Sequence, residues 1–292
     1  MAAVVLVHGI WNRQRGLSAT AAAAELAAEG RKRLRYGLVG AGLGHIPLPT
    51  VAMAYYADLL ADEQPQEPQS GDGGLEDLTP DQLAEAWQWL VAAGVPQEPE
   101  AQAGWLAPVR QGLGWLVRHR SAPSLTARAQ RQLTERLGRL VVAVLQDTDA
   151  YLSRPQRRQA VRDVVARAVS DTRPQVLVAH SLGTVVAYEA LHAYPELRLD
   201  LFVTVGSPLG LPALLRKLEP EPCGLRGTRP PGVAHWINIA DAGDLVAVPP
   251  ELGGAFPVNA HASTEIGLFD LHTLGGYLAN GVTAAAIAPY LV

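Results

Sequence analysis

The stretch VLVAHSLGTVVAYEAL, residues 176–191, decides the fold class. Its first four residues are apolar, as expected of a buried strand, and a helical pattern begins at Leu182. Ser181 lies between the two. It is either a nucleophile on a sharp strand-to-helix turn or a serine that caps the helix.

Strands and helices alternate on both sides of this stretch. Apolar runs predict further strands at residues 3–7, 51–56, 201–205 and 233–240. Helical patterns predict helices at residues 18–34, 155–169, 182–191 and 212–218. Alternation of this kind predicts the α/β class, with a mostly parallel sheet flanked by helices.

A helical segment interrupts the alternation. Residues 62–75 are rich in Gln, Pro, Gly and acidic residues, which is typical of an exposed loop. No strong strand pattern occurs at residues 79–170, and residues 125–145 carry an apolar helical stripe. We expect one α/β domain over residues 1–292, with a helical cap insertion at about 62–150.

Composition and charge exclude some partners. The chain has 292 residues, of which 48% are hydrophobic and 18% charged, as in a globular protein with a sizeable core. The net charge of −4 argues against nucleic acid. Residues 58–102 are acidic without Lys or Arg, whereas residues 110–173 are rich in Arg. Two solvated, mutually paired faces are expected, with attraction of an anionic substrate or membrane surface as the alternative.

Several kinds of site and location are also disfavoured. Cys223 is the single cysteine, which excludes an intrachain disulfide and a multi-cysteine metal site. HExxH-type spacing, a P-loop and GxGxxG are absent, so we expect no metal and no cofactor. No signal-peptide pattern is present, which favours the cytoplasm. The uncharged stretches 36–57 and 273–292 contain Gly and Pro, so we expect no stable membrane insertion.

Residues with useful chemistry follow four of the predicted strands. They are His8-Gly9-Ile10, His180-Ser181-Leu182-Gly183, Gly206-Ser207-Pro208 and Asp241-Ala242-Gly243-Asp244, with His272 further along the chain. Carboxyl ends of parallel strands meet at one edge of a sheet, where ligands bind. The order Ser, Asp, His is the triad order of one large hydrolase fold.

Five motifs together resemble the α/β-hydrolase superfamily, and more specifically its lipase- and esterase-like members. They are VVLVHG (4–9), VLVAHSLG (176–183), TVGSPLG (204–210), NIADAGDLVAVP (238–249) and DLHTLGGYL (270–278). The family pattern at the nucleophile is G-x-S-x-G. Here Ala179 replaces the first glycine, which adds one methyl group, and Gly183 keeps the second. The resemblance implies an α/β-hydrolase fold with Ser181 as nucleophile.

The resemblance also implies the base. A serine needs a base to take its proton and an acid to orient that base. The family's base lies in a loop after the last strand, which favours His272 over His261. His180 adjoins the serine in a turn where the two side chains diverge, and we expect it to line the substrate pocket.

Two aspartates compete for the role of the acid. Asp244 precedes an apolar run and a Pro, as the family's acid does, and is favoured. Asp241 directly follows a strand and is expected to cap the turn. Asp270 is the third choice.

An acyl-transfer site also needs donors for a developing oxyanion. One is expected to be the backbone N–H of Leu182, after the nucleophile and at a helix N-terminus. The resemblance implies Ile10, the residue after His-Gly, as the other. Trp11 is a candidate for the substrate pocket. Four tryptophans of the helical segment either pack its core or line an acyl pocket: Trp87, Trp89, Trp105 and Trp115.

The implied function is a serine hydrolase that cleaves a carboxylic ester with an apolar acyl group through an acyl-enzyme. Its partner would be a small-molecule acyl ester or a related acyl compound. The same triad also serves peptidases, amidases and thioesterase-like acyltransferases or cyclases, so these remain alternatives. A non-catalytic binding protein on the same fold is a third possibility.

Overall fold

The chain folds into two compact units. The first, here called the α/β unit, comprises residues 1–61 and 151–292; the second, the helical unit, comprises residues 62–150. The computed structural model describes residues 3–61, 73–97, 104–120, 126–267 and 272–292. The bounds of the helical unit coincide with the segment in which the sequence predicts a helical insertion.

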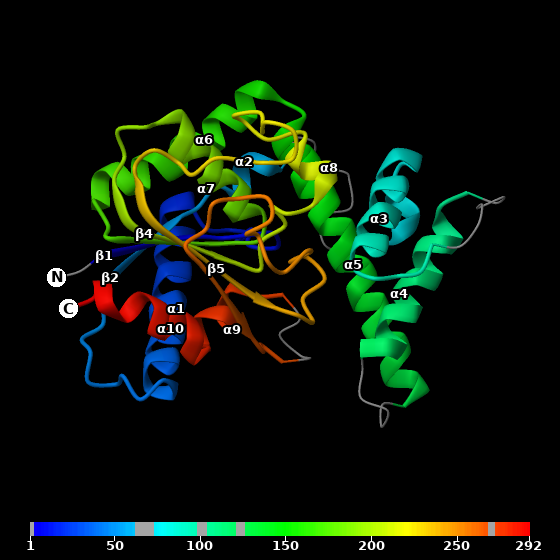
Figure 1. Cartoon of the computed structure of the whole chain (residues 1–292), viewed down its shortest axis with the longest axis horizontal. Helices are drawn as coiled ribbons and strands as arrows, with labels where there is room; N and C mark the ends of the chain where they lie inside the picture. Colours follow the sequence, from blue (N-terminus) through cyan, green and yellow to red (C-terminus); the bar gives the residue numbers. More distant parts are fainter. Residues whose placement is uncertain (1–2, 62–72, 98–103, 121–125, 268–271) are drawn as a thin grey trace. The chain divides into compact units, whose positions relative to one another are not determined.

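A six-stranded parallel sheet forms the centre of the α/β unit (Figure 1). Its strands are β1 (Ala3–Val7), β2 (Thr50–Ala54), β3 (Val176–His180), β4 (Leu199–Val205), β5 (Val233–Asp241) and β6 (Ala260–Thr264). Their order is β2-β1-β3-β4-β5-β6, and every neighbouring pair is parallel. The predicted α/β class with a parallel sheet is confirmed.

The strand register brings the chemically useful residues to one edge of the sheet. Val7 of β1 lies opposite Ala179 of β3, and His180 lies opposite Val205 of β4. Val205 in turn lies opposite Ile239 of β5. The chain segments that follow β1, β3, β4 and β5 therefore leave the sheet at the same edge, as expected for parallel strands.

Strand β6 is absent from the sequence prediction. Its sequence is AHAST, which is small and polar and has little intrinsic strand preference. Its residues pair with Ile237–Asp241 of β5 and form the last strand of the sheet. Tertiary pairing, rather than local pattern, makes this segment a strand.

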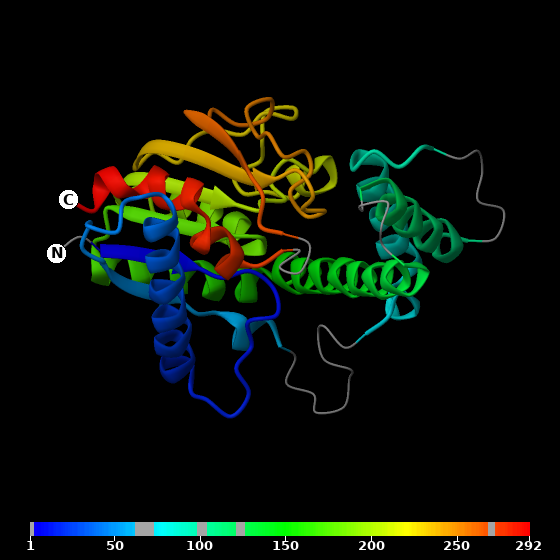
Figure 2. The same ribbon diagram turned by 90° about the horizontal axis from the view of Figure 1, so that it is seen from below.

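Helices flank the sheet, as predicted. They are α1 (Ala19–Gly40), α2 (Ala57–Leu60), α6 (Pro155–Thr172), α7 (Leu182–Ala193), α8 (Pro212–Leu215), α9 (Leu274–Ala279), α10 (Gly281–Ile287) and the 3-10 helix η2 (Ala288–Tyr290). Helix α1 packs with α9 and α10, and α6 packs with α7 (Figure 2). The two groups lie on opposite sides of the sheet (Figure 1).

Helix α1 extends beyond the predicted end at Leu34. A Cβ atom at Gly37 would lie 2.4 Å from the carbonyl oxygen of Leu278 in α9. Gly37 thus allows the two helices to approach closely, which explains a glycine inside a helix despite its low helix propensity.

The helical unit contains η1 (Leu75–Asp77), α3 (Pro80–Ala92), α4 (Leu106–Arg120) and most of α5 (Ala127–Leu152). A capping box starts α3: Thr79 Oγ1 accepts from the Gln82 backbone N–H at 3.2 Å, and Gln82 Oε1 accepts from the Thr79 N–H at 3.0 Å. The rings of Trp87 and Trp105 lie 6.4 Å apart, and Trp89 is buried. The burial of Trp89 fits the packing interpretation for that residue, whereas Trp105 is exposed.

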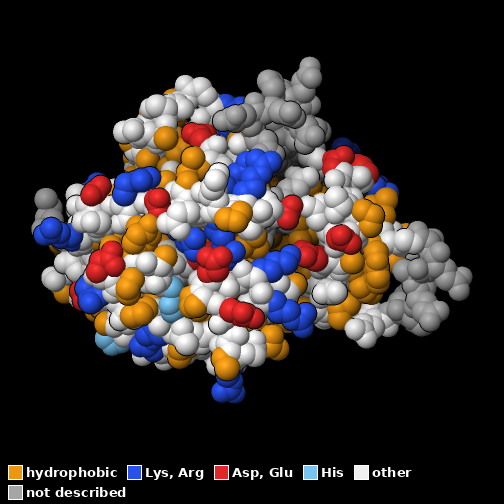
Figure 3. Space-filling model, turned by 90° about the horizontal axis from the view of Figure 1, so that it is seen from above, with side chains coloured by type: hydrophobic (Ala, Val, Ile, Leu, Met, Phe, Trp, Pro, Cys, Tyr) orange, Lys and Arg blue, Asp and Glu red, His pale blue; other side chains and the backbone are white. Residues whose placement is uncertain are grey.

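Charged side chains of both signs are mixed on the face shown in Figure 3. Within the helical unit, an ion pair joins the acidic and basic segments, with Arg110 Nη2 lying 2.9 Å from Glu76 Oε2. This contact is of the kind expected if the two segments pair with each other. No helix in the described part of the chain is long and apolar enough to cross a membrane.

Candidate active site

Ser181 lies on a strained turn between β3 and α7. Its backbone angles, φ 54° and ψ −132°, fall in a region that residues other than glycine rarely adopt. It takes the N-cap position of α7, yet its side chain makes no capping hydrogen bond. Ser181 Oγ is buried and has no hydrogen-bond partner among the described residues. The helix-cap interpretation of this serine is therefore wrong.

Glycines on both sides allow this turn to form. A Cβ atom at Gly9 would lie 2.5 Å from Ser181 Cβ, and one at Gly183 would lie 2.3 Å from the carbonyl oxygen of His8. The backbone that follows β1 thus packs directly against the turn. Ala179 is fully buried within β3, so the strand accommodates its extra methyl group.

The structure brings Asp244 and His272 together. His272 Nδ1 lies 2.7 Å from Asp244 Oδ2, and both residues are buried. Asp244 Oδ1 accepts a hydrogen bond from the Val246 N–H at 2.9 Å, and Asp244 Oδ2 accepts one from Tyr277 Oη at 2.7 Å. A neutral His272 that donates from Nδ1 presents Nε2 as a lone-pair acceptor. Such a ring can take a proton from an alcohol.

The competing candidates have other partners. Asp241 accepts hydrogen bonds from the backbone N–H groups of Gly243 and Ile266, each at 2.7 Å, and so caps the turn as expected. His261 lies in β6, where its Nδ1 accepts from Asn238 Nδ2 at 2.9 Å. Asp270 lies outside the described residues. Of the two candidate acids that the structure describes, Asp244 is the one that contacts His272.

Short contacts link this pair to the serine turn. The rings of His180 and His272 have centroids 4.4 Å apart. A Cβ atom at Gly9 would lie 2.9 Å from His180 Nδ1, and one at Gly206 would lie 3.1 Å from His272 Cε1. Ser181 Oγ and His272 Nε2 are not hydrogen-bonded to each other. Apo sites often tighten such a bond only when substrate binds.

Unpartnered polar atoms concentrate here. Within the described residues, Ser181 Oγ, His272 Nε2 and both ring nitrogens of His180 are buried without a hydrogen bond. Each buried polar atom without a partner costs about 1–3 kcal/mol of stability. Burial, reinforced by the neighbouring His272 and His8, lowers the pKa of His180 well below 6.5. His180 is thus a neutral ring that can donate one hydrogen bond and accept another.

Two backbone N–H groups beside the serine are also unpartnered. Leu182 is the first residue of α7, and Ile10 follows Gly9 in the loop after β1. Neither N–H donates a hydrogen bond within the described part of the chain. The N-terminus of a helix carries a partial positive charge that favours an anion. Trp11, the next residue, is 46% exposed and has a φ of 59°.

Sequence reasoning missed the side chains that support these groups. Tyr277 lies in α9 and reaches Asp244, while Tyr56, after β2, donates from Oη to the His8 carbonyl oxygen at 2.7 Å. Burial, together with the nearby Asp244 carboxylate, raises the pKa of Tyr277. No local pattern marks either tyrosine, because its partner lies far away in the chain.

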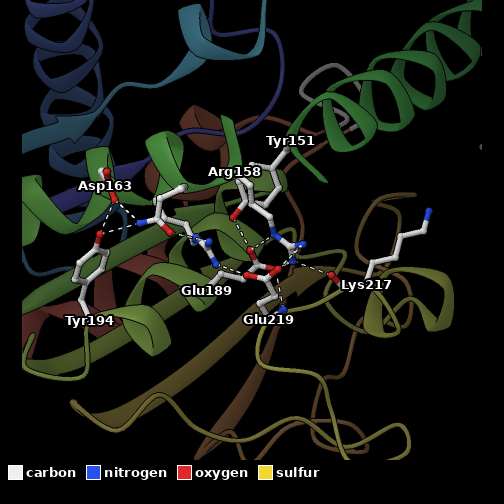
Figure 4. Close-up of polar contacts among 9 residues, drawn as sticks. Tyr151, Arg158, Asp163, Glu189, Tyr194, Lys217 and Glu219 are labelled. Atoms are coloured by element: carbon white, nitrogen blue, oxygen red, sulfur yellow. Dashed lines mark hydrogen bonds and ion pairs between the residues drawn. The ribbon is translucent and has the colours of Figure 1, made fainter. Parts of the chain in front are cut away.

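A buried polar network anchors α7 (Figure 4). Glu189 of α7 is fully buried and accepts hydrogen bonds from Tyr151 Oη at 2.6 Å, Arg158 Nε at 2.8 Å and the Glu219 N–H at 3.0 Å. Arg158 Nη2 also donates to the Lys217 carbonyl oxygen at 2.7 Å. The network therefore fixes the helix whose N-terminus adjoins Ser181.

The described residues contain no group of three or more His, Cys, Asp or Glu side chains that could hold a metal ion. Comparisons of the chain with protein-family models, with curated proteins and with solved structures found no significant match.

Proposed function

We propose that this protein is a serine hydrolase of the α/β-hydrolase type that cleaves a carboxylic ester with an apolar acyl group. One observation carries the proposal. Ser181, which has a strained backbone and a side chain that makes no capping hydrogen bond, lies at the same sheet edge as the buried Asp244–His272 pair. Strained backbone of this kind clusters at active sites.

The proposed reaction starts when Ser181 Oγ attacks the ester carbonyl carbon. His272 Nε2 takes the hydroxyl proton, while Asp244 holds the ring by its Nδ1–H and stabilises the imidazolium. The tetrahedral intermediate collapses, the C–O bond to the alcohol breaks, and His272 returns the proton to the departing oxygen. Water then attacks the acyl-enzyme by the same route and releases the acid.

The negative charge of the tetrahedral intermediate needs donors fixed before reaction. The unpartnered N–H groups of Ile10 and Leu182 supply two beside Ser181. In such sites, removing one donor costs about 10²–10³-fold in kcat. The indole of Trp11, which follows Ile10 and is 46% exposed, offers an apolar surface beside this loop and supports an apolar acyl group.

Covalent labelling tests the nucleophile. A fluorophosphonate probe is expected to label the folded wild-type protein and Ser170→Ala, in which an exposed helix serine is removed. It should not label Ser181→Ala. Absence of labelling in the folded wild type would contradict the proposal.

A series of p-nitrophenyl esters with increasing acyl length tests the substrate class. We expect kcat/KM to rise with chain length over the shorter acyl groups, because added methylene groups leave water. Equal kcat/KM across the series would rule out an apolar acyl subsite.

A further inference from the structure

The loop after β1 is held by hydrogen bonds to its own carbonyl oxygens. Asn12 Nδ2 donates to the carbonyl oxygen of Gly9 at 3.2 Å and to that of Ile10 at 2.6 Å. His8 Nδ1 lies 2.8 Å from the same Gly9 oxygen. Two side chains therefore converge on the Gly9 carbonyl group.

His8 is itself fixed from the other side. Its Nε2 accepts from the Tyr56 backbone N–H at 3.1 Å, and its ring stacks on that of Tyr56 with centroids 4.2 Å apart. Burial is the main cause that lowers the pKa of His8, to about 4. The ring is thus neutral at pH 7, with Nε2 accepting and Nδ1 donating.

The Gly9 carbonyl group and the Ile10 N–H belong to one peptide unit. In a planar trans peptide, the C=O and N–H bonds point in opposite directions. Anchoring the Gly9 oxygen therefore sets the direction of the Ile10 N–H. That N–H has no partner within the described residues, and its loop packs against Ser181.

We infer that Asn12 is a positioning residue that aims the Ile10 N–H at the oxyanion formed on Ser181. The inference rests on the proposed serine hydrolase activity. Asn12 directly follows Trp11, whose φ is positive, and the Asn12 side chain donates hydrogen bonds to the carbonyl oxygens of Gly9 and Ile10. It touches neither substrate nor reacting atoms and acts through the peptide that it holds.

Asn12→Ala and Asn12→Asp test this role. The aspartate has the same shape but, when ionised, no donor, and it repels the two carbonyl oxygens. We expect kcat for a p-nitrophenyl ester to fall about 10²-fold in both variants, because a donor misplaced by about 1 Å loses that much rate. KM should stay within about 3-fold, as ground-state binding is unchanged.

A boronic acid inhibitor supplies a readout that a purely structural role would not move. Its adduct with a serine is a tetrahedral anion, so its inhibition constant should rise by a factor similar to the loss in kcat. Asn259→Ala is the matched control. Asn259 Oδ1 accepts a hydrogen bond from the Trp236 backbone N–H at 2.8 Å. Asn259 directly precedes β6, at the edge of the sheet opposite to the candidate site, so removing its side chain should leave kcat and boronate inhibition unchanged.

The outcomes separate the two proposals. Active Asn12 variants with kcat within about 3-fold of wild type, or with lowered kcat but unaltered boronate inhibition, would overturn the positioning role. If Asn12→Ala does not fold, Asn12→Asp decides. A folded wild type that is neither labelled nor active contradicts the proposed function instead.

Discussion

His272 Nδ1 and Asp244 Oδ2 lie 2.7 Å apart, although 28 positions separate the residues in the chain. The pair is buried, and Val246 and Tyr277 hold the aspartate through further hydrogen bonds. This arrangement fixes both the position of the imidazole and the nitrogen that carries its proton. The contact with His272 also distinguishes Asp244 from Asp241, the other candidate for the acid that the sequence offers.

Asp244→Asn is expected to lower kcat by about 10³–10⁴-fold, because an amide favours the wrong tautomer of His272. Ester hydrolysis with purified protein measures the change. Asp241→Asn is the matched control, since Asp241 caps a turn and should leave kcat within about 10-fold of wild type. An Asp241→Asn variant as inactive as Asp244→Asn would contradict the assignment.

Stability is expected to fall as the pH is lowered from about 6.5 to 4. The pKa of His8 drops from 6.5 to about 4 on folding, so the unfolded chain binds more protons in this range. The contribution is fully present above the unfolded pKa and is lost as the pH falls towards the folded pKa. For His8, the loss between pH 7 and 5 is of the order of 2 kcal/mol.

Urea unfolding at several pH values measures this slope. His8→Asn removes the titrating ring and keeps a donor near the Nδ1 position, so its free energy of unfolding should depend less steeply on pH. His180, whose pKa is also lowered, leaves a residual slope of the same sign. His45→Asn changes an exposed histidine and should keep the wild-type slope; equal slopes in all three proteins would refute the prediction.

Glu189→Gln is expected to destabilise the protein by about 3 kcal/mol, because it breaks a buried ion pair and leaves Arg158 without its main partner. Urea unfolding gives the free energy change. Glu29→Gln, which affects an exposed pair with Arg33, should cost less than about 1 kcal/mol. Equal losses in the two variants would show that the network around α7 does not stabilise the fold.

Trp11→Gly should be more stable than Trp11→Ala by about 1 kcal/mol, since only glycine adopts a positive φ without strain. Both variants lose the same half-exposed indole, so their difference isolates the backbone. Thermal unfolding compares them. A Trp11→Ala variant as stable as Trp11→Gly would mean that the loop relaxes to another conformation.

Local patterns were sufficient for the strands that lie inside the sheet. Residues 3–7 and 176–179 are apolar throughout, because central parallel strands are covered on both faces. The edge strand β6 carries no such pattern, so the sequence alone does not predict it. The sequence also predicts an end of α1 that is too early, because Gly37 serves a contact with α9 that the sequence does not display.

By itself, the sequence determined the α/β class and the turn that carries Ser181, since both follow from apolar periodicity and small residues at adjacent positions. The tertiary structure decided which aspartate meets His272, which side chains hold Asp244 and the Gly9 carbonyl group, and how α7 is anchored. The physical reason for this division is the distance along the chain over which each kind of interaction acts. Burial patterns repeat within a few residues. Hydrogen bonds between distant segments depend on which strands become neighbours in the sheet, and the pattern of a single segment does not show this.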